Sequence, residues 1–342
     1  MINKRAREGF FVETKEKLIF DVKGNVHPPN RIISYLRYFP KKTGDRKRNK
    51  ENYEKVYSLD ERTAIISRNY PQYQFYDANF GLTLQGVSIV NLYKIHDPVK
   101  FRLNLSEKNT ISSLKKNALD LTNILIDELG INENKIGITG SPMVDLAKRG
   151  SDIDLVIYGS NNVKKTREGL KNLFEEDNEI KRYNKKGLRT LYQFKSNDMN
   201  ISWEDFIQIE PRKIFEGTFR NIDFYIRGVK DWNEIEHFYG DFRIKKFYNA
   251  TIEGTIENSD ESLYTPCIYK IKNSRILQSN IDPINIDEVF SYRGRFCELL
   301  RAGEEFKAHG KIEKVILKSG ESYNRLIIGG NKYDFLKLKK GE

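Results

Sequence analysis

The chain has 342 residues, of which 38% are hydrophobic and 31% are charged, and its formal net charge is +11. This apolar content is enough for two or three packed domains, so a globally disordered protein is excluded. No run of about 18 uncharged apolar residues occurs, so no transmembrane helix is predicted. Residues 1–7 are polar and basic and lack the apolar stretch of a secretory signal, which predicts a cytoplasmic location.

The first hundred residues are typical of a mainly β structure with one helix. Apolar, β-branched runs at residues 18–22 and 32–36 predict two strands, separated by Gly24 and by Pro28-Pro29. The sequence from Ser58 to Glu61 is a capping-box pattern, so we expect a helix that starts at Leu59 and ends before residue 71, a proline.

A basic run lies between these elements. Residues 41–50 contain six basic residues against one acid. Such a run is usually a mobile, solvated loop, but it also fits a contact with nucleic acid. The residues that would make this contact are Lys41, Lys42, Arg46, Lys47 and Arg48.

Helical and strand patterns alternate in the middle of the chain. Apolar residues on one face predict a helix within residues 107–129, with Gly130 as its C-terminal cap. We then expect a strand at 135–139, a short helix at 142–148, a strand at 152–158, a helix around 163–174, and strands at 191–194 and 222–226. This alternation predicts a catalytic domain at residues 106–240, after an N-terminal β-rich domain at 1–105.

The remaining residues, 241–342, are β-rich again. Strand patterns at 251–256, 267–271 and 311–315 predict a small β-barrel, and an OB-like barrel is our hypothesis. Cys267 and Cys297 are the only cysteines and form no Cys/His cluster, so zinc is not predicted. Two reduced core thiols are favoured over a disulfide.

The strongest chemical pattern is an acid pair. Asp152 and Asp154 are two residues apart in an otherwise apolar, β-branched run, so in a strand their side chains point to the same side. Two neighbouring carboxylates repel each other, and burial makes this more costly. A hard cation such as Mg²⁺ removes the conflict because it coordinates both.

A glycine turn precedes the acid pair. Gly140 allows close backbone approach, Ser141 is a good N-cap and Pro142 a good first helical residue. The amides of such a helix start can bind phosphate oxygens. The alternative is that Ser141 is only a cap and the aspartates only the solvated end of a strand.

Together, Gly140-Ser141 and the sequence from Ser151 to Leu155 resemble the DNA polymerase β-type nucleotidyltransferase superfamily. The resemblance implies an α+β fold with a mixed sheet and flanking helices, and a third acid on a later strand. Asp223, one acid in an apolar run, is the best match for it. Its rivals lie in polar or helix-like surroundings: Asp198, Glu204, Asp205 and Glu210. The whole chain is also similar to a group of uncharacterised archaeal proteins that are predicted to be nucleotidyltransferases.

The resemblance further implies two Mg²⁺ ions held by the three aspartates, with Mn²⁺ able to substitute, and a nucleoside triphosphate as substrate. Gly140 and Ser141 would bind its phosphates. Lys148 and Arg149 would either help to neutralise them or form a solvated helix end. Further basic candidates follow at Lys185, Lys186 and Arg189.

The expected function is transfer of a nucleoside monophosphate to an acceptor hydroxyl, with pyrophosphate release. The basic excess and aromatics of the predicted barrel favour RNA, or another nucleic acid, as acceptor. Tyr248, Tyr269, Tyr292, Phe296 and Tyr323 are these aromatics, although core packing explains most of them equally well. Transfer to a protein or small molecule, and a non-catalytic nucleic-acid-binding protein of the same fold, are the alternatives.

Overall fold

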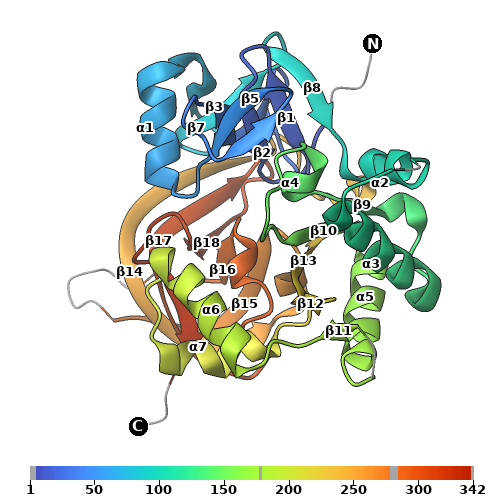
Figure 1. Cartoon of the computed structure of the whole chain (residues 1–342). Coiled ribbons are helices and arrows are strands. Elements are labelled where there is room, and N and C mark those ends of the chain that lie inside the picture. Colours follow the sequence, from blue (N-terminus) through green and yellow to red (C-terminus); the bar gives the residue numbers. More distant parts are fainter. Residues whose placement is uncertain (1–4, 109, 177–178, 278–283, 340–342) are drawn as a thin grey trace. The chain divides into compact units, whose positions relative to one another are not determined.

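The computed structural model describes residues 5–108, 110–176, 179–277 and 284–339, without the side chain of Asp198 (Figure 1). The chain divides into two compact units. Unit 1 comprises residues 1–76, 83–181 and 215–239, and unit 2 comprises residues 77–82, 182–214 and 240–342. The three domains expected from the sequence, with boundaries at residues 105 and 240, stay a prediction.

An antiparallel sheet forms the N-terminal part of unit 1. Its main path runs in the order β4-β5-β3-β2-β1-β8, and β7 pairs with both β3 and β6. The strands predicted at 18–22 and 32–36 are confirmed as β2 and β3. The strand bounds are β1 Phe11–Thr14, β2 Ile19–Val22, β3 Arg31–Pro40, β4 Arg46–Arg48, β5 Glu51–Lys55, β6 Gln74–Asp77, β7 Leu82–Ser88 and β8 Leu92–His96.

Helix α1 (Leu59–Asn69) confirms the capping-box prediction. The hydroxyl of Ser58 accepts a hydrogen bond from the backbone N–H of Glu61 at 3.3 Å. Proline at position 71 follows the helix, as expected for a residue that cannot continue it.

Part of the basic run that was expected as a loop is a β-hairpin. Arg48 pairs with Glu51, so β4 and β5 are joined by Asn49 and Lys50. Both turn residues have a positive φ, 49° and 67°. Two such residues give the turn whose twist matches paired strands. The loop expectation was therefore wrong for residues 46–48, because pairing with β5 satisfies their backbone groups.

The second sheet of unit 1 is mixed and has the order β11-β12-β13-β10-β9. Its central strands β10 and β13 are parallel, with Ile153 opposite Phe224 and Asp154 opposite Tyr225. All other neighbours in this sheet are antiparallel. The bounds are β9 Ile136–Ile138, β10 Ile153–Tyr158, β11 Ile180–Lys181, β12 Glu216–Phe219 and β13 Ile222–Val229.

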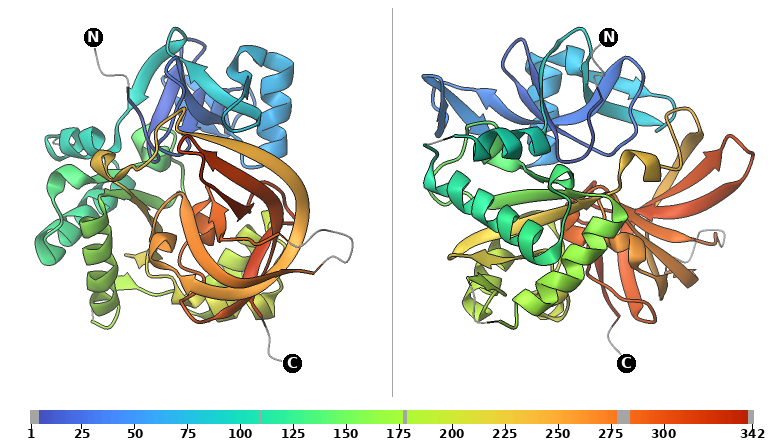
Figure 2. Two further views of the ribbon diagram at one scale, coloured as in Figure 1. Left: turned by 180° about the vertical axis from the view of Figure 1, so that it is seen from behind. Right: turned by 90° about the vertical axis from the view of Figure 1, so that its right-hand side faces the viewer.

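Unit 1 also contains helices α2 (Pro98–Ser106), α3 (Ser113–Leu129) and α5 (Ser160–Leu173). Helix α3 buries Ala118, Leu121 and Leu125 and ends at Gly130, whose φ of 61° is left-handed, as predicted. Helices α3 and α5 contact each other and β10 (Figure 2). The strand predicted at 152–158 and the helix around 163–174 are confirmed by β10 and α5.

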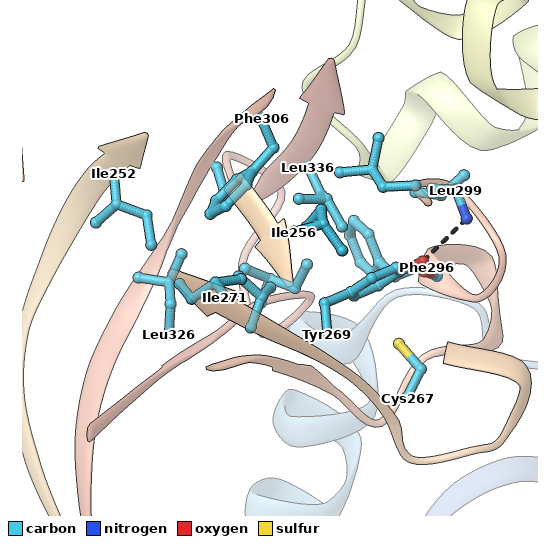
Figure 3. Packing of buried hydrophobic residues seen from close by; sticks show 14 of the residues in the cluster. Ile252, Ile256, Cys267, Tyr269, Ile271, Phe296, Leu299, Phe306, Leu326 and Leu336 are labelled. Carbon is cyan, nitrogen blue, oxygen red and sulfur yellow. Dashed lines mark hydrogen bonds between the residues drawn. The ribbon is translucent and has the colours of Figure 1, made fainter. Parts of the chain in front are cut away.

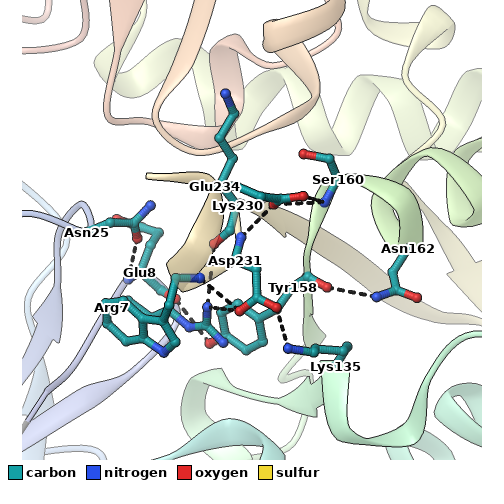
Figure 4. Close-up of polar contacts among 11 residues, drawn as sticks. Arg7, Glu8, Asn25, Lys135, Tyr158, Ser160, Asn162, Lys230, Asp231 and Glu234 are labelled. Atoms are coloured by element: carbon teal, nitrogen blue, oxygen red, sulfur yellow. Dashed lines mark hydrogen bonds and ion pairs between the residues drawn. The ribbon is translucent and has the colours of Figure 1, made fainter. Parts of the chain in front are cut away.

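A network of polar side chains connects the N-terminal segment to the C-terminal ends of β10 and β13 (Figure 4). Arg7 donates to the carboxylate of Asp231 at 3.0 Å, and its guanidinium lies 3.6 Å from the ring centroid of Tyr158. Tyr158 donates to the backbone oxygen of Glu8 at 3.2 Å. Buried apolar residues of both sheets, including Phe20 and Val156, form one core beside this network.

Unit 2 contains a six-stranded sheet whose pairings return to their starting strand. The order β14-β15-β16-β18-β17-β19 is supplemented by a pairing between β14 and β17, and β16 and β18 are parallel. Strand β14 is long and strongly curved (Figure 2). The predicted strands at 251–256, 267–271 and 311–315 are confirmed. The bounds are β14 Phe242–Asn258, β15 Cys267–Ile276, β16 Glu288–Ser291, β17 Glu305–Leu317, β18 Ser322–Ile327 and β19 Phe335–Leu338.

The sheet of unit 2 encloses a tightly packed core (Figure 3). Tyr269 and Phe296 belong to this core, so for these two aromatics core packing is correct. The hydroxyl of Tyr269 donates to the carbonyl of Phe296 at 2.7 Å and accepts from the N–H of Leu299 at 2.9 Å. Cys267 and Cys297 are buried here as free thiols, which agrees with the favoured interpretation.

Unit 2 also contains α6 (Lys185–Lys195) and α7 (Trp203–Ile209). The strand predicted at residues 191–194 was wrong, because these residues form the end of α6. The side chain of Asn184 accepts from the N–H of Gly187 and caps this helix, so its start lies before the apolar residues from which a strand was inferred. Among the described helices, none is both long and apolar enough to span a bilayer.

Candidate active site

The glycine turn and the acid pair meet at the junction of β9 and β10. The N–H of Thr139 donates to the backbone oxygen of Asp154 at 2.9 Å. A Cβ atom added to Gly140 would lie 2.8 Å from the Cγ of Asp154 and still closer to one carboxylate oxygen. Gly140 also has a φ of 69°, a left-handed conformation that favours glycine. Only glycine therefore allows the turn to lie against this carboxylate.

The helix after this turn is shorter than predicted. Helix α4 (Gly140–Met143) has Thr139 at its N-cap position, not Ser141. The expected extension to residue 148 was wrong, because Asp145 adopts a φ of 56° and the chain turns away. Ser141 is 2% exposed, and its hydroxyl makes no hydrogen bond among the described residues. A buried hydroxyl without a hydrogen-bond partner costs free energy, and a hydrogen bond from a bound ligand would remove this cost.

Asp154 lies at the start of β10, Asp152 immediately precedes this strand, and the two carboxylates interact electrostatically. Asp152 is exposed and Asp154 is half-buried. Burial, followed by the charge of Asp152, raises the pKa of Asp154 to about 7. Within the described part of the chain, neither carboxylate forms a hydrogen bond or an ion pair. The site thus offers two carboxylates that form no ion pair with any described residue, the Ser141 hydroxyl, and a turn that other groups can approach closely. This donor set fits a hard divalent cation and a phosphate.

Asp223 lies on β13, the parallel neighbour of β10. Asp154 is opposite Tyr225, and Asp223 precedes Tyr225 by two residues, as Asp152 precedes Asp154. Since alternate residues of a strand share a face, Asp223 lies on the face that carries Asp154. In the described residues, no three or more His, Cys, Asp or Glu side chains are grouped closely enough to hold a metal ion. The third-ligand role of Asp223 stays a prediction.

Comparison with known proteins agrees with this arrangement. A family model of the nucleotidyltransferase domain matches residues 121–210, which include the turn and the acid pair. The chain is also 31% identical to "Uncharacterized protein MJ1086" of Methanocaldococcus jannaschii over 341 residues, which cover 96% of this chain and 98% of that protein. This chain belongs to the DNA polymerase β-type nucleotidyltransferase superfamily. No solved structure is matched.

The basic residues predicted beside the nucleotidyltransferase turn have different surroundings. Lys148 forms an ion pair with Asp45, and Arg149 is exposed. Arg46 is 5% exposed and donates to the backbone oxygen of Leu146 at 2.5 Å. Hairpin β4–β5 thus contacts the segment that connects the turn to the acid pair.

The other members of the basic run divide into paired and exposed side chains. Arg48 makes a bidentate pair with Glu13 at 3.0 and 3.1 Å. Lys41 pairs with Glu54 at 2.6 Å, whereas Lys42 and Lys47 are exposed. A role of this run in nucleic-acid binding stays a prediction.

The rivals of Asp223 and the later basic candidates belong to unit 2. Asp205 pairs with Lys337 at 2.7 Å, and Glu210 pairs with Lys195. Glu204 lies in the first turn of α7, and the side chain of Asp198 lies outside the described residues. The exposed basic candidates lie on α6: Lys185, Lys186 and Arg189.

Three cations around the acid pair were not among the site residues predicted from the sequence. The charges of Lys55, Arg227 and Arg37 all act on Asp154. Arg227 is on the Asp223–Tyr225 face of β13 and donates to Glu8 at 2.8 Å. Strand alternation from Asp223 could have identified Arg227. Nothing local marks Lys55 and Arg37, because they precede Asp154 by about one hundred residues or more.

Proposed function

We propose that this nucleotidyltransferase superfamily member is a Mg²⁺-dependent enzyme. It transfers a nucleoside monophosphate from a nucleoside triphosphate to an acceptor hydroxyl, preferably on RNA or another nucleic acid. The proposal depends on one observation above all: Gly140 lies directly against the carboxylate of Asp154. This contact brings a turn suited to phosphate next to a pair of carboxylates suited to a cation.

In this proposal Asp152, Asp154 and Asp223 hold two Mg²⁺ ions, for which Mn²⁺ can substitute. When bound, the ions neutralise charge on the triphosphate and favour ionisation of the acceptor hydroxyl. The backbone at Gly140 and the hydroxyl of Ser141 bind phosphate oxygens. The buried Ser141 hydroxyl without a partner supports this role.

The chemical step exchanges one phosphorus–oxygen bond for another. The acceptor oxygen forms a bond to the α-phosphorus while the bond to the bridging oxygen breaks, and pyrophosphate leaves with that electron pair. The acceptor proton passes to Asp223 or to water. Since Asp223 is exposed at the start of β13, an acceptor can reach it from solvent.

Two observations support a nucleic-acid acceptor: the net charge of +11 and the order in which the strands of unit 2 pair. In OB-like barrels five strands close on themselves and present a surface to oligonucleotides. In unit 2, five strands pair in the order β14-β15-β16-β18-β17, and β17 also pairs with β14, so the sheet closes on itself. This closure supports our hypothesis of such a barrel. A cytoplasmic location is part of the same proposal.

The test is to incubate the protein with each labelled nucleoside triphosphate, with Mg²⁺, Mn²⁺ or chelator, and with RNA, DNA, protein and small hydroxyl compounds in separate reactions. We expect cation-dependent label on RNA and loss of transfer in Asp152→Ala and Asp154→Ala. Asp127→Ala, an exposed acid on α3, is the matched control. Label found only on protein or on a small molecule would replace the acceptor, and unchanged transfer in both site variants would reject the catalytic site.

A further inference from the structure

The N-terminal sheet of unit 1 carries a lysine toward the acid pair. Lys55 ends β5 and is opposite Tyr38 of β3, so both side chains lie on the same face of the sheet. Tyr38 packs in one apolar cluster with Met143, Val144 and Leu146, which follow the Gly140 turn. Lys55 is therefore on the face that covers the turn.

The electrostatics of Lys55 agree with this position. Its charge interacts with both Asp152 and Asp154, and burial lowers the pKa of Lys55 to about 8. Within the described residues, Lys55 nevertheless forms no ion pair within 4 Å. Its ammonium lies 4.9 Å from the ring centroid of Tyr57, an aromatic side chain that is 47% exposed.

Arg37 is a second cation at the same place. Its guanidinium donates to the backbone oxygen of Val56 at 3.2 Å and lies 5.4 Å from the ring centroid of Tyr57. The charge of Arg37 also acts on Asp154 and on Lys55. Two like charges beside one ring repel each other, so an anion between them would stabilise the arrangement.

Three other cations near the turn are already engaged. Lys148 is paired with Asp45, Arg46 donates to Leu146, and Arg48 is paired with Glu13. By contrast, the charge of Lys55 acts on Asp152 and Asp154, and Lys55 forms an ion pair with neither. A ligand that places an anionic group near Lys55 and a bound cation near Asp152 and Asp154 would neutralise the lysine and the two carboxylates. A metal-bound polyphosphate has this composition.

We propose that Lys55 and Arg37, supplied by the N-terminal sheet, bind the polyphosphate of the incoming nucleoside triphosphate. This proposal rests on the proposed function and makes the N-terminal sheet part of the nucleotide site. It assigns the neutralising role to residues that lie far before the acid pair in sequence, in place of Lys148 and Arg149. The adjacent Gly140 turn would bind the same polyphosphate from the opposite side.

The test compares binding of ATP, inorganic pyrophosphate and AMP, each with Mg²⁺, by titration calorimetry of the full chain. Loss of one charge-assisted contact should weaken binding of ATP and pyrophosphate about tenfold to a hundredfold in Lys55→Met, with AMP affinity unchanged. Arg37→Met should act in the same direction. Lys55→Arg should restore most of the affinity, because it keeps the charge.

Lys94→Met is the matched control, since Lys94 is an exposed lysine on β8 of the same N-terminal sheet. In transfer assays Lys55→Met should raise the KM for the triphosphate more than it lowers kcat. If Lys55→Met binds ATP like the wild type, while Asp152→Ala still abolishes transfer, the polyphosphate proposal is overturned and the proposed function stands. Weaker binding of an RNA oligonucleotide with unchanged ATP affinity would also overturn it. A wild-type protein that neither binds nor transfers any nucleoside triphosphate would reject both.

Discussion

Gly140 touches the carboxylate of Asp154, and no side chain larger than hydrogen fits between the turn and the strand. A Cβ atom at this position would lie 2.8 Å from the Cγ and 2.9 Å from the Cβ of Asp154. The contact is possible because β9 and β10 are antiparallel neighbours, with Ile138 opposite Leu155. The turn that leaves β9 must therefore pass over the start of β10.

Gly140→Ala should lower nucleotidyl transfer at least about a hundredfold, because the added methyl group displaces Asp154 or the turn. Gly150→Ala is the matched control. Gly150 also has a positive φ, 78°, but a Cβ there meets no atom within 4 Å. Both variants carry about 1–2 kcal/mol of backbone strain, so only the contact with Asp154 distinguishes them. Equal losses of activity in the two variants would mean that strain alone is responsible.

Asp154→Asn should raise the melting temperature in chelator and remove the stabilisation by Mn²⁺. Without a cation, the substitution relieves repulsion from Asp152, on the order of 1 kcal/mol, or about 2–4 °C. With Mn²⁺, the wild type should gain stability and the variant should not. Thermal melts with chelator and with Mn²⁺ measure both effects. Asp127→Asn should follow the wild type in both, and a Mn²⁺ response retained by Asp154→Asn would argue against the cation site.

Glu13→Ala should destabilise unit 1 by about 3–5 kcal/mol, because it leaves a partly buried arginine without its partner. Glu13 is 4% exposed and accepts from both Arg48, at 3.0 and 3.1 Å, and His96, at 2.9 Å. Glu51→Ala removes the exposed pair with Lys17 and should cost less than about 1 kcal/mol. Urea unfolding compares the two. Similar small losses would show that hairpin β4–β5 does not depend on the buried pair.

His27 should make the protein less stable as the pH falls from about 6.5 to about 4. One ring nitrogen of His27 lies 3.0 Å from the backbone oxygen of Ala6, and the other accepts from the N–H of Ile33 at 3.2 Å. Burial lowers the pKa of His27 from 6.5 to about 4. Between these values the unfolded chain binds the proton and the folded chain does not, so acid favours unfolding.

The effect of His27 should reach about 2 kcal/mol, below the full value for the shift, because the ring is only half-buried. His27→Gln should therefore lose less stability than the wild type between pH 6.5 and pH 4, measured by urea unfolding at several pH values. His237→Gln, at an exposed position, should keep the wild-type slope. An identical slope in His27→Gln would exclude His27 as the source.

The local elements and the two chemical motifs could be predicted from the amino-acid sequence, because they depend on residues close together in the chain. Ser58 and Gly130 identified helix ends because capping depends on neighbouring backbone groups, and β-branched runs identified the central strands. The acids at 152 and 154 and the glycine at 140 are close in sequence, so their meeting requires only one turn. A short apolar segment fits both the helical and the strand pattern, and residues 191–194 are such a segment. The strand interpretation was wrong there, because these residues form the end of α6.

Which cations surround the acid pair could not be predicted in this way, because it depends on long-range contacts in the fold. Lys55 and Arg37 come from strands of the first sixty residues, and sheet register and packing of Tyr38 on the α4 segment bring them to the site. Likewise, Arg46 and Arg48 belonged to a run that composition alone describes as solvated, yet Leu146 and Glu13 engage them. Such pairings depend on contacts between residues far apart in the chain, and no local pattern of amino acids encodes them.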